Sequence, residues 1–174
     1  MDTEKIRETL KECDWEFCEE EVENTPDRIK RFMEEWDDSD FNFTMFENPD
    51  YNEMVILKDI EFSSICAHHL LPFHGKGHIG YIPDKKICGI SKLARALDKF
   101  AHRPQTQEKL IQELADFLEE KLEPQGLMIV LEAQHDCMRI RGIKKKNSQM
   151  VTSVIRGAFK EQDKTRKEFL ELIK

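Results

Sequence analysis

The first third of the chain carries apolar residues at helical spacing. One stripe recurs at three- and four-residue steps and predicts a helix with a narrow buried face; its members are Ile6, Leu10, Cys13 and Phe17. The segment TPDRIKRFMEEW at residues 25–36 predicts a second helix, with Thr25 as its N-cap and Pro26 in its first turn. Residues 37–53 are acidic and rich in turn-forming residues, so we predict a loop there.

From residue 54 the pattern changes to strands separated by two helices. Runs of β-branched and aromatic residues predict four strands, at 54–65, 76–83, 126–138 and 148–159. The first two are joined through a long connection that holds a cluster of histidines. Apolar residues at helical spacing predict helices that open at Ser91 and at Pro104, and a short last helix at 164–173.

The predicted order of elements indicates an α+β protein. Two strands, two helices and two strands would form a four-stranded antiparallel sheet with its helices on one face. Such a sheet leaves its other face and its edges exposed, so we expect it to associate into a larger sheet or barrel. We divide the chain into an N-terminal helical region, 1–53, and one functional unit, 54–174.

Composition narrows the classes of function. The 174 residues are 39% hydrophobic and 36% charged, as in an ordinary globular protein, and the net charge of −8 argues against non-specific binding of nucleic acid. Residues 1–60 carry a net charge of −13 and the remainder +5, so an anionic ligand is expected to bind the second part. The sequence contains neither an apolar run of membrane-spanning length nor the apolar core of a signal peptide, which predicts a cytoplasmic protein.

Cysteine and histidine form two clusters that suggest a metal site. Cys66 and His69 are three residues apart, a spacing that lets a thiolate and an imidazole reach one zinc ion from a tight turn. His135 and Cys137 are two apart and are predicted to share a strand face. A set of Cys66, His69 and Cys137 would leave the fourth zinc position open to water, whose pKa the metal lowers toward about 7.

Two neighbouring histidines are not needed as ligands in this set. His68 and His135 would therefore be available for proton transfer. The alternative is that the cysteines are ordinary buried thiols, and a single C-x-x-H pair does not exclude it. Without such neighbours, the other cysteines are interpreted as core or partly buried thiols; they are Cys13, Cys18 and Cys88.

The segment GISKLAR predicts a phosphate site. Ser91 is a natural N-cap, and Lys92 and Arg95 lie on one side of the first turn that follows it. An ordinary capped surface helix is the alternative. Arg139 and Arg141 extend the positive charge, and a strand at this point would place them on the same face as Cys137.

A third candidate is the segment RPQTQEKL. Gln107 and Glu108 fall in the first turn of a predicted helix, where the helix dipole favours an acidic side chain. The functional alternative is purine recognition, because one carboxylate can accept two hydrogen bonds from the donor edge of guanine.

Together these motifs resemble the GTP cyclohydrolase I family. The resemblance runs in order from residue 54 to 174, and TPDR at 25–28 is also similar to the family. Its motifs are CAHHLLPF at 66–73, GHIGYIP at 77–83, GISKLAR at 89–95, RPQTQEKL at 103–110, EAQHDCMRIRG at 132–142 and VTS at 151–153. Because the N-terminal region is short, we expect no regulatory extension and no allosteric control.

The resemblance implies a fold, an activity and a set of residue roles. It implies the tunnelling fold, a ring of ten identical subunits with active sites between them, and conversion of GTP into formate and 7,8-dihydroneopterin triphosphate, a precursor in pterin and folate synthesis. It implies zinc on Cys66, His69 and Cys137, with His68 and His135 as acid–base residues. The triphosphate contacts would be Ser91, Lys92, Arg95, Arg141 and, from a neighbouring subunit, Arg28; the guanine contacts would be Gln107 and Glu108.

One position departs from the family pattern. Ala67 stands where glutamate is common, so a carboxylate that could orient a zinc ligand is missing. Two alternatives remain open: another enzyme of the tunnelling-fold superfamily, and a zinc-stabilised ring that binds GTP without turning it over. The first would not keep both the zinc set and the SKLAR motif, and only Ala67 favours the second.

Overall fold

The computed structural model describes residues 2–36 and 41–174, which belong to two compact units. The first unit ends at Asp38 and the second begins at Ser39. The loop predicted at 37–53 lies partly outside the described residues, and within it a short strand, β1 (Met45–Glu47), forms. The division into functional regions at residue 53 stays a prediction.

The first unit consists of two helices, α1 (Thr3–Glu12) and α2 (Glu19–Trp36). The predicted start of the second helix at Thr25 is wrong, and Pro26 lies inside α2. Three glutamates in the first turn complement the helix dipole, and the Glu21 carboxylate accepts a hydrogen bond from the Cys18 N–H at 2.9 Å. These contacts stabilise an N-terminus six residues before the predicted one.

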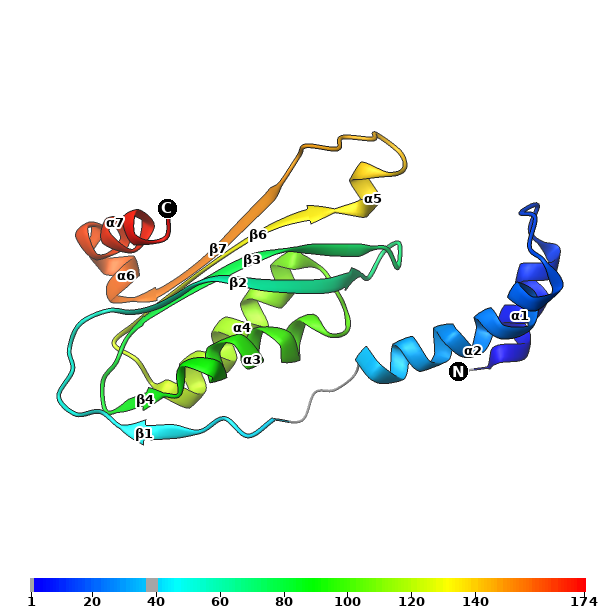
Figure 1. The fold of residues 1–174 in the computed structure, drawn as a ribbon. Coiled ribbons are helices and arrows are strands. Elements are labelled where there is room, and N and C mark those ends of the chain that lie inside the picture. Colours follow the sequence, from blue (N-terminus) through cyan, green and yellow to red (C-terminus); the bar gives the residue numbers. More distant parts are fainter. Residues whose placement is uncertain (1, 37–40) are drawn as a thin grey trace. The chain divides into compact units, whose positions relative to one another are not determined.

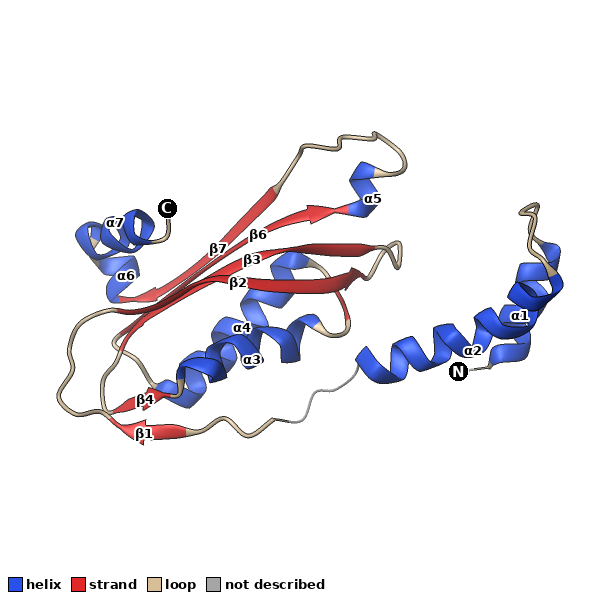
Figure 2. Ribbon diagram, viewed as in Figure 1, coloured by secondary structure: helices blue, strands red, loops and turns tan. Residues whose placement is uncertain are grey.

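A curved five-stranded sheet forms the centre of the second unit (Figures 1 and 2). Its order is β5-β2-β3-β6-β7, and the pairs β2–β3, β3–β6 and β6–β7 are antiparallel. The bounds are β2 Val55–Cys66, β3 Pro72–Ile82, β5 Pro104–Gln105, β6 Gly126–His135 and β7 Met150–Gly157. The four predicted strands are thus confirmed, and β5, which was predicted as the start of a helix, pairs in parallel with the end of β2.

The connection between β2 and β3 is shorter than predicted. The strand β3 begins at Pro72, so only residues 67–71 join it to Cys66, and the two strands form a long hairpin. At the other end of β3, the strand β4 (Lys86–Cys88) pairs with β1 in a separate two-stranded sheet. The hairpin loop and β4 therefore lie at opposite ends of β3.

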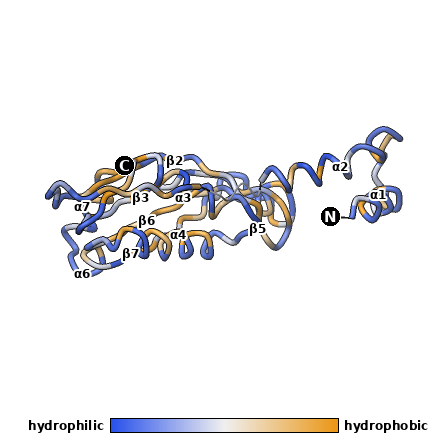
Figure 3. Tube along the Cα trace, turned by 90° about the horizontal axis from the view of Figure 1, so that it is seen from below, coloured by the Kyte–Doolittle hydropathy of each residue, from blue (hydrophilic) through white to orange (hydrophobic). Residues whose placement is uncertain are grey.

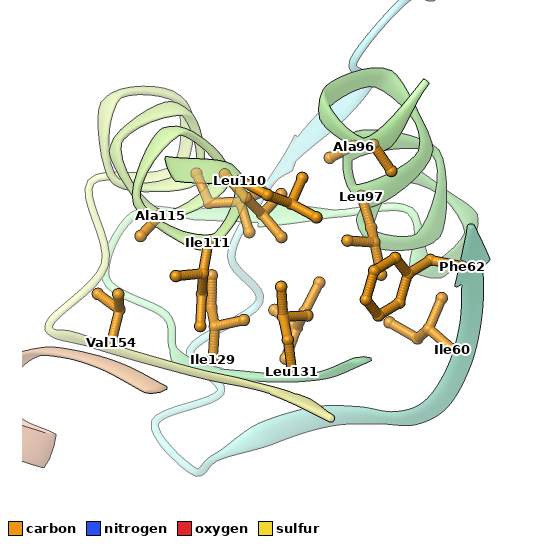
Figure 4. Close-up of a cluster of buried hydrophobic side chains, with 14 of the residues drawn as sticks. Ile60, Phe62, Ala96, Leu97, Leu110, Ile111, Ala115, Ile129, Leu131 and Val154 are labelled. Carbon is orange, nitrogen blue, oxygen red and sulfur yellow. The ribbon is translucent and has the colours of Figure 1, made fainter. Parts of the chain in front are cut away.

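Two helices, α3 (Ile90–Ala101) and α4 (Gln107–Leu122), cover one face of the sheet. Alternate residues of β6 point toward them, and Figure 4 shows Ile129 and Leu131 facing the helices that carry Ile111 and Leu97. Consistent with burial on both faces, the trace of β6 is mostly hydrophobic (Figure 3). This layer is the main hydrophobic core, and it confirms the α+β class.

The prediction that helices occupy only one face is wrong. Two short helices, α6 (Ala158–Glu161) and α7 (Asp163–Leu172), pack on the opposite face against Met128 and Val130. Phe169 of α7 is fully buried there, and its ring lies where a Cβ at Gly80 would come within 2.6 Å. Because apolar residues on both sides of β6 need cover, a second helical layer forms. None of the helices in the described ranges is long and apolar enough to span a membrane.

Candidate active site

A tight turn after β2 brings Cys66 and His69 together. The Leu70 N–H donates to the Cys66 carbonyl at 2.8 Å, and the Cys66 N–H donates to the Leu71 carbonyl at 2.8 Å. The Ala67 N–H donates to the Gln105 carbonyl of β5, which holds the turn from outside. As a result, Cys66 Sγ lies 3.7 Å from His69 Nδ1.

Cys137 reaches the same place from a short helix, and the predicted strand through this residue is wrong. The strand β6 ends at His135, and α5 (Asp136–Arg139) follows. The Arg139 guanidinium bonds the Asp136 carboxylate at 3.1 Å, which stabilises the helical turn. Arg139 and Arg141 therefore do not share a strand face with Cys137.

The three side chains form a group that can hold a metal ion. The ligand atoms of Cys66, His69 and Cys137 all lie within 4.8 Å of one another, and Cys66 is buried while His69 is exposed. Zinc bonds of about 2.3 Å to sulfur and 2.0–2.1 Å to nitrogen place tetrahedral ligands roughly 3.5–3.8 Å apart. The Cys66–His69 distance of 3.7 Å fits this requirement.

The electrostatics of the group also suit a cation. Burial, followed by the neighbouring Cys66 sulfur, raises the pKa of the Cys137 thiol, while the Arg141 cation lowers it. The nearby Cys66 sulfur disfavours ionisation of Cys137, and a divalent cation between the two sulfurs would reverse that effect. The donor set therefore fits zinc.

His135 lies beside this group and is held on two sides. Its ring is stacked on Phe73 with the centroids 4.6 Å apart and an interplanar angle of 3°. Its Nε2 lies 2.9 Å from Gln107 Oε1. Burial lowers the pKa of His135, and the Glu108 carboxylate partly opposes that shift. His68 is exposed, with its ring 6.3 Å from that of His69.

The N-terminus of α4 brings Gln107 and Glu108 to His135. The helix begins two residues after β5, with Thr106 rather than Pro104 at its start, and the Thr106 hydroxyl accepts from the Lys109 N–H. Glu108 is exposed in the first turn, whereas the Gln107 side chain is fully buried. The two members of the predicted guanine-binding pair thus have different surroundings.

The predicted phosphate residues Ser91, Lys92 and Arg95 lie in the first half of α3, far from Cys66. Leu97 packs over Gly77, which pairs with Ile60, about 20 Å along β2 from Cys66. Ser91 lies about 9 Å further along α3, on the side of β4, so it is roughly 25–30 Å from Cys66. One chain therefore does not bring the phosphate set and the metal group together.

Gly89, not Ser91, is the N-cap of α3, because the Lys92 N–H bonds the Gly89 carbonyl at 2.8 Å; no side chain caps the helix. Arg28 lies in α2 of the first unit, where its guanidinium bonds the Glu20 carboxylate at 3.1 Å. Arg141 is exposed beside Cys137.

Sequence reasoning missed the residues that support the site. Gln105 and Phe73 are almost completely buried behind Cys66 and His135, and Thr152 of β7 accepts a hydrogen bond from the Gln107 amide at 3.1 Å. Phe73 could have been found as a buried strand position. The other two act through contacts between distant segments, which no local pattern records.

Comparison with known proteins agrees with this geometry. The model of the GTP cyclohydrolase I family matches residues 3–174. The GTP cyclohydrolase 1 of Aquifex aeolicus is 53% identical over 157 residues, covering 89% of this chain and 85% of the relative. That of Hydrogenobaculum sp. is 44% identical and covers all of this chain and 99% of the relative.

A solved structure, the archaeosine synthase QueF-Like in the apo form, is similar over 60% of this chain and 93% of that one. Its TM-score of 0.49 and identity of 16% are too low to bear on the fold. The family match, in contrast, covers residues 3–174 and so includes both segments that supply the Cys66, His69 and Cys137 group. The chain therefore belongs to the GTP cyclohydrolase I family of enzymes.

Proposed function

We propose that this enzyme hydrolyses GTP in a zinc-dependent reaction that opens the imidazole ring, releases formate and rearranges the product to 7,8-dihydroneopterin triphosphate. The observation that carries the proposal is the Cys66, His69 and Cys137 group beside the half-buried His135, in a chain of this family. Its relatives from Aquifex aeolicus and Hydrogenobaculum are named GTP cyclohydrolase 1.

Cys66, His69 and Cys137 would hold the zinc ion and leave one tetrahedral position open. When bound there, zinc would lower the pKa of a water molecule toward about 7 and so supply a nucleophile for C8 of the purine at neutral pH. The backbone of the 67–71 turn sets the position of His69 through main-chain hydrogen bonds. Since these bonds do not involve the side chain of residue 67, Ala67 is compatible with the site.

The other residues near the metal group would bind and orient the guanine base and transfer protons. Glu108 is exposed at the N-terminus of α4 and close enough to His135 to affect its pKa, so its carboxylate can bind the donor edge of guanine beside that histidine. His135 and His68 would transfer protons to and from the opening ring. Arg141 adds a cation for the phosphates near the metal group.

The separation within one chain supports an active site shared between subunits. Ser91, Lys92 and Arg95 lie roughly 25–30 Å from Cys66, farther than one nucleoside triphosphate spans. The N-terminus of α3 has no side-chain cap and no acidic residue in its first turn, which suits a phosphate group. We propose that these residues, with Arg28, serve the metal group of a neighbouring copy in a ring of ten cytoplasmic subunits with the tunnelling fold.

The direct test is turnover of GTP by the zinc-loaded protein. Formate release and the fluorescence of the oxidised product should both appear, and both should be lost on removal of zinc with a chelator and return when zinc is restored. Equal activity without the metal would overturn zinc dependence. Bound zinc and bound GTP with no product would favour a binding protein instead.

A further inference from the structure

The buried amide of Gln107 links His135 to the sheet. We propose that Gln107 is a positioning residue that fixes the tautomer and the ring orientation of His135, rather than a ligand of the guanine base. The functional consequence rests on the proposed role of His135 in proton transfer. The tautomer and the ring orientation of His135 do not depend on that role.

The surroundings of Gln107 determine which way its amide points. Its Nε2 lies 3.0 Å from the Leu131 carbonyl, 3.2 Å from the Met150 carbonyl and 3.1 Å from Thr152 Oγ1. Backbone carbonyls only accept hydrogen bonds, so the NH₂ group must face them. The amide oxygen is then directed at His135, with Oε1 2.9 Å from Nε2.

An amide oxygen only accepts hydrogen bonds, so its bond to His135 determines the tautomer of that histidine. The Nε2 of His135 must carry a hydrogen to bond Gln107 Oε1, so in the neutral ring the lone pair is on Nδ1. The stacking on fully buried Phe73 fixes the plane of the same ring. Gln107 and Phe73 together therefore select one nitrogen and one direction for proton transfer.

This arrangement assigns the two nitrogens different tasks. A proton released by the attacking water can bind Nδ1 and then pass to a ring nitrogen of the substrate, so the histidine ends as it began. The Nε2 hydrogen stays in its bond to Gln107 throughout. The Gln107 side chain has no exposed surface, so a substrate could reach its amide only if the bonds to β6 and β7 were broken.

The tautomer can be read without turnover. In zinc-loaded protein with ¹⁵N-labelled histidine, solid-state NMR should show His135 with Nε2 protonated and Nδ1 unprotonated, the signals being assigned by their loss in His135→Asn. A wild-type spectrum with the proton on Nδ1 would overturn the proposal, whatever the variants do. Absence of GTP turnover would instead count against the proposed function and leave the tautomer result intact.

Kinetics of Gln107→Met distinguish positioning from substrate binding. We expect kcat to fall about 10- to 100-fold, the usual loss when a partner that orients a site histidine is removed, while the KM for GTP changes less than about threefold and His135 becomes a mixture of tautomers. Gln112→Met, at an exposed position on the same helix whose amide donates to the Asp116 carboxylate at 2.7 Å, is the matched control and should leave all three unchanged. A large rise in KM with kcat and tautomer unchanged would refute positioning.

Discussion

Mixing two inactive variants tests whether one active site takes its residues from two chains. The first variant, Cys137→Ala, loses one of the three proposed metal ligands. The second, Lys92→Ala with Arg95→Ala, loses two proposed phosphate contacts and keeps the metal group. Because the two sets lie roughly 25–30 Å apart in one chain, each variant retains intact the set that the other lacks.

The loss of kcat/KM in the second variant and the fraction of active sites restored by mixing can both be calculated. A hydrogen bond to a charged group contributes about 1.5–3 kcal/mol, so losing Lys92 and Arg95 should reduce kcat/KM at least about 100-fold. In the proposed ring, mixed 1:1, a site would work when its metal set comes from the Lys92→Ala, Arg95→Ala chain and its phosphate set from the Cys137→Ala chain. Random assembly gives this combination in about a quarter of the sites.

The assay is GTP turnover by rings assembled from both variants. The variants are co-expressed with two different affinity tags and purified on both, so that every ring contains both chains. Activity per subunit should reach about one quarter of that of the wild type, against about 1% or less for each variant alone. Wild-type chains that carry the same two tags provide the reference.

The outcome that refutes shared sites is equally clear. If doubly purified rings contain zinc in the Lys92→Ala, Arg95→Ala subunits but stay as inactive as the separate variants, the two sets work within one chain. The separation of roughly 25–30 Å estimated along β2 and α3 would then have to close by a large rearrangement.

Two other predictions concern the sheet face opposite α3 and α4. Replacing fully buried Phe169 with Ala should lower the free energy of unfolding by about 3–5 kcal/mol, measured in urea at fixed protein concentration, whereas Leu170→Ala, 40% exposed, should cost less than about 1 kcal/mol; equal losses would contradict the packing described for α7. Burial lowers the pKa of His78 below its usual 6.5, and its Nδ1 accepts the Asp59 N–H at 3.2 Å. A base whose folded pKa is lowered stabilises fully above its unfolded pKa and loses that contribution as pH falls through the folded value. The Tm of the wild type should therefore drop more steeply below pH 6.5 than that of His78→Gln, and parallel curves would show that His78 is not responsible.

Much of the fold follows from the sequence because strands and helices differ in the period of their apolar residues. The four antiparallel strands and the last helix lie within a few residues of the predicted ranges, apart from β3, which begins at Pro72 rather than at residue 76. The prediction of element ends failed where something other than the period of apolar residues decides them. The helix α2 begins at Glu19 because of an acidic first turn and a bond from Cys18, and β5 forms because Pro104 and Gln105 meet the end of β2.

Part of the candidate site, too, could be predicted from the sequence, and part could not. The residue types and spacing of Cys66, His69 and Cys137 are sufficient to suggest zinc, because ligand chemistry depends on which donors are present. Only the tertiary structure shows that Cys137 arrives on a helical turn, that the Gln107 amide is buried against three acceptors, and that Ser91 lies far from Cys66. Sequence spacing measures distance along the chain, whereas these facts depend on how the chain returns to itself in space.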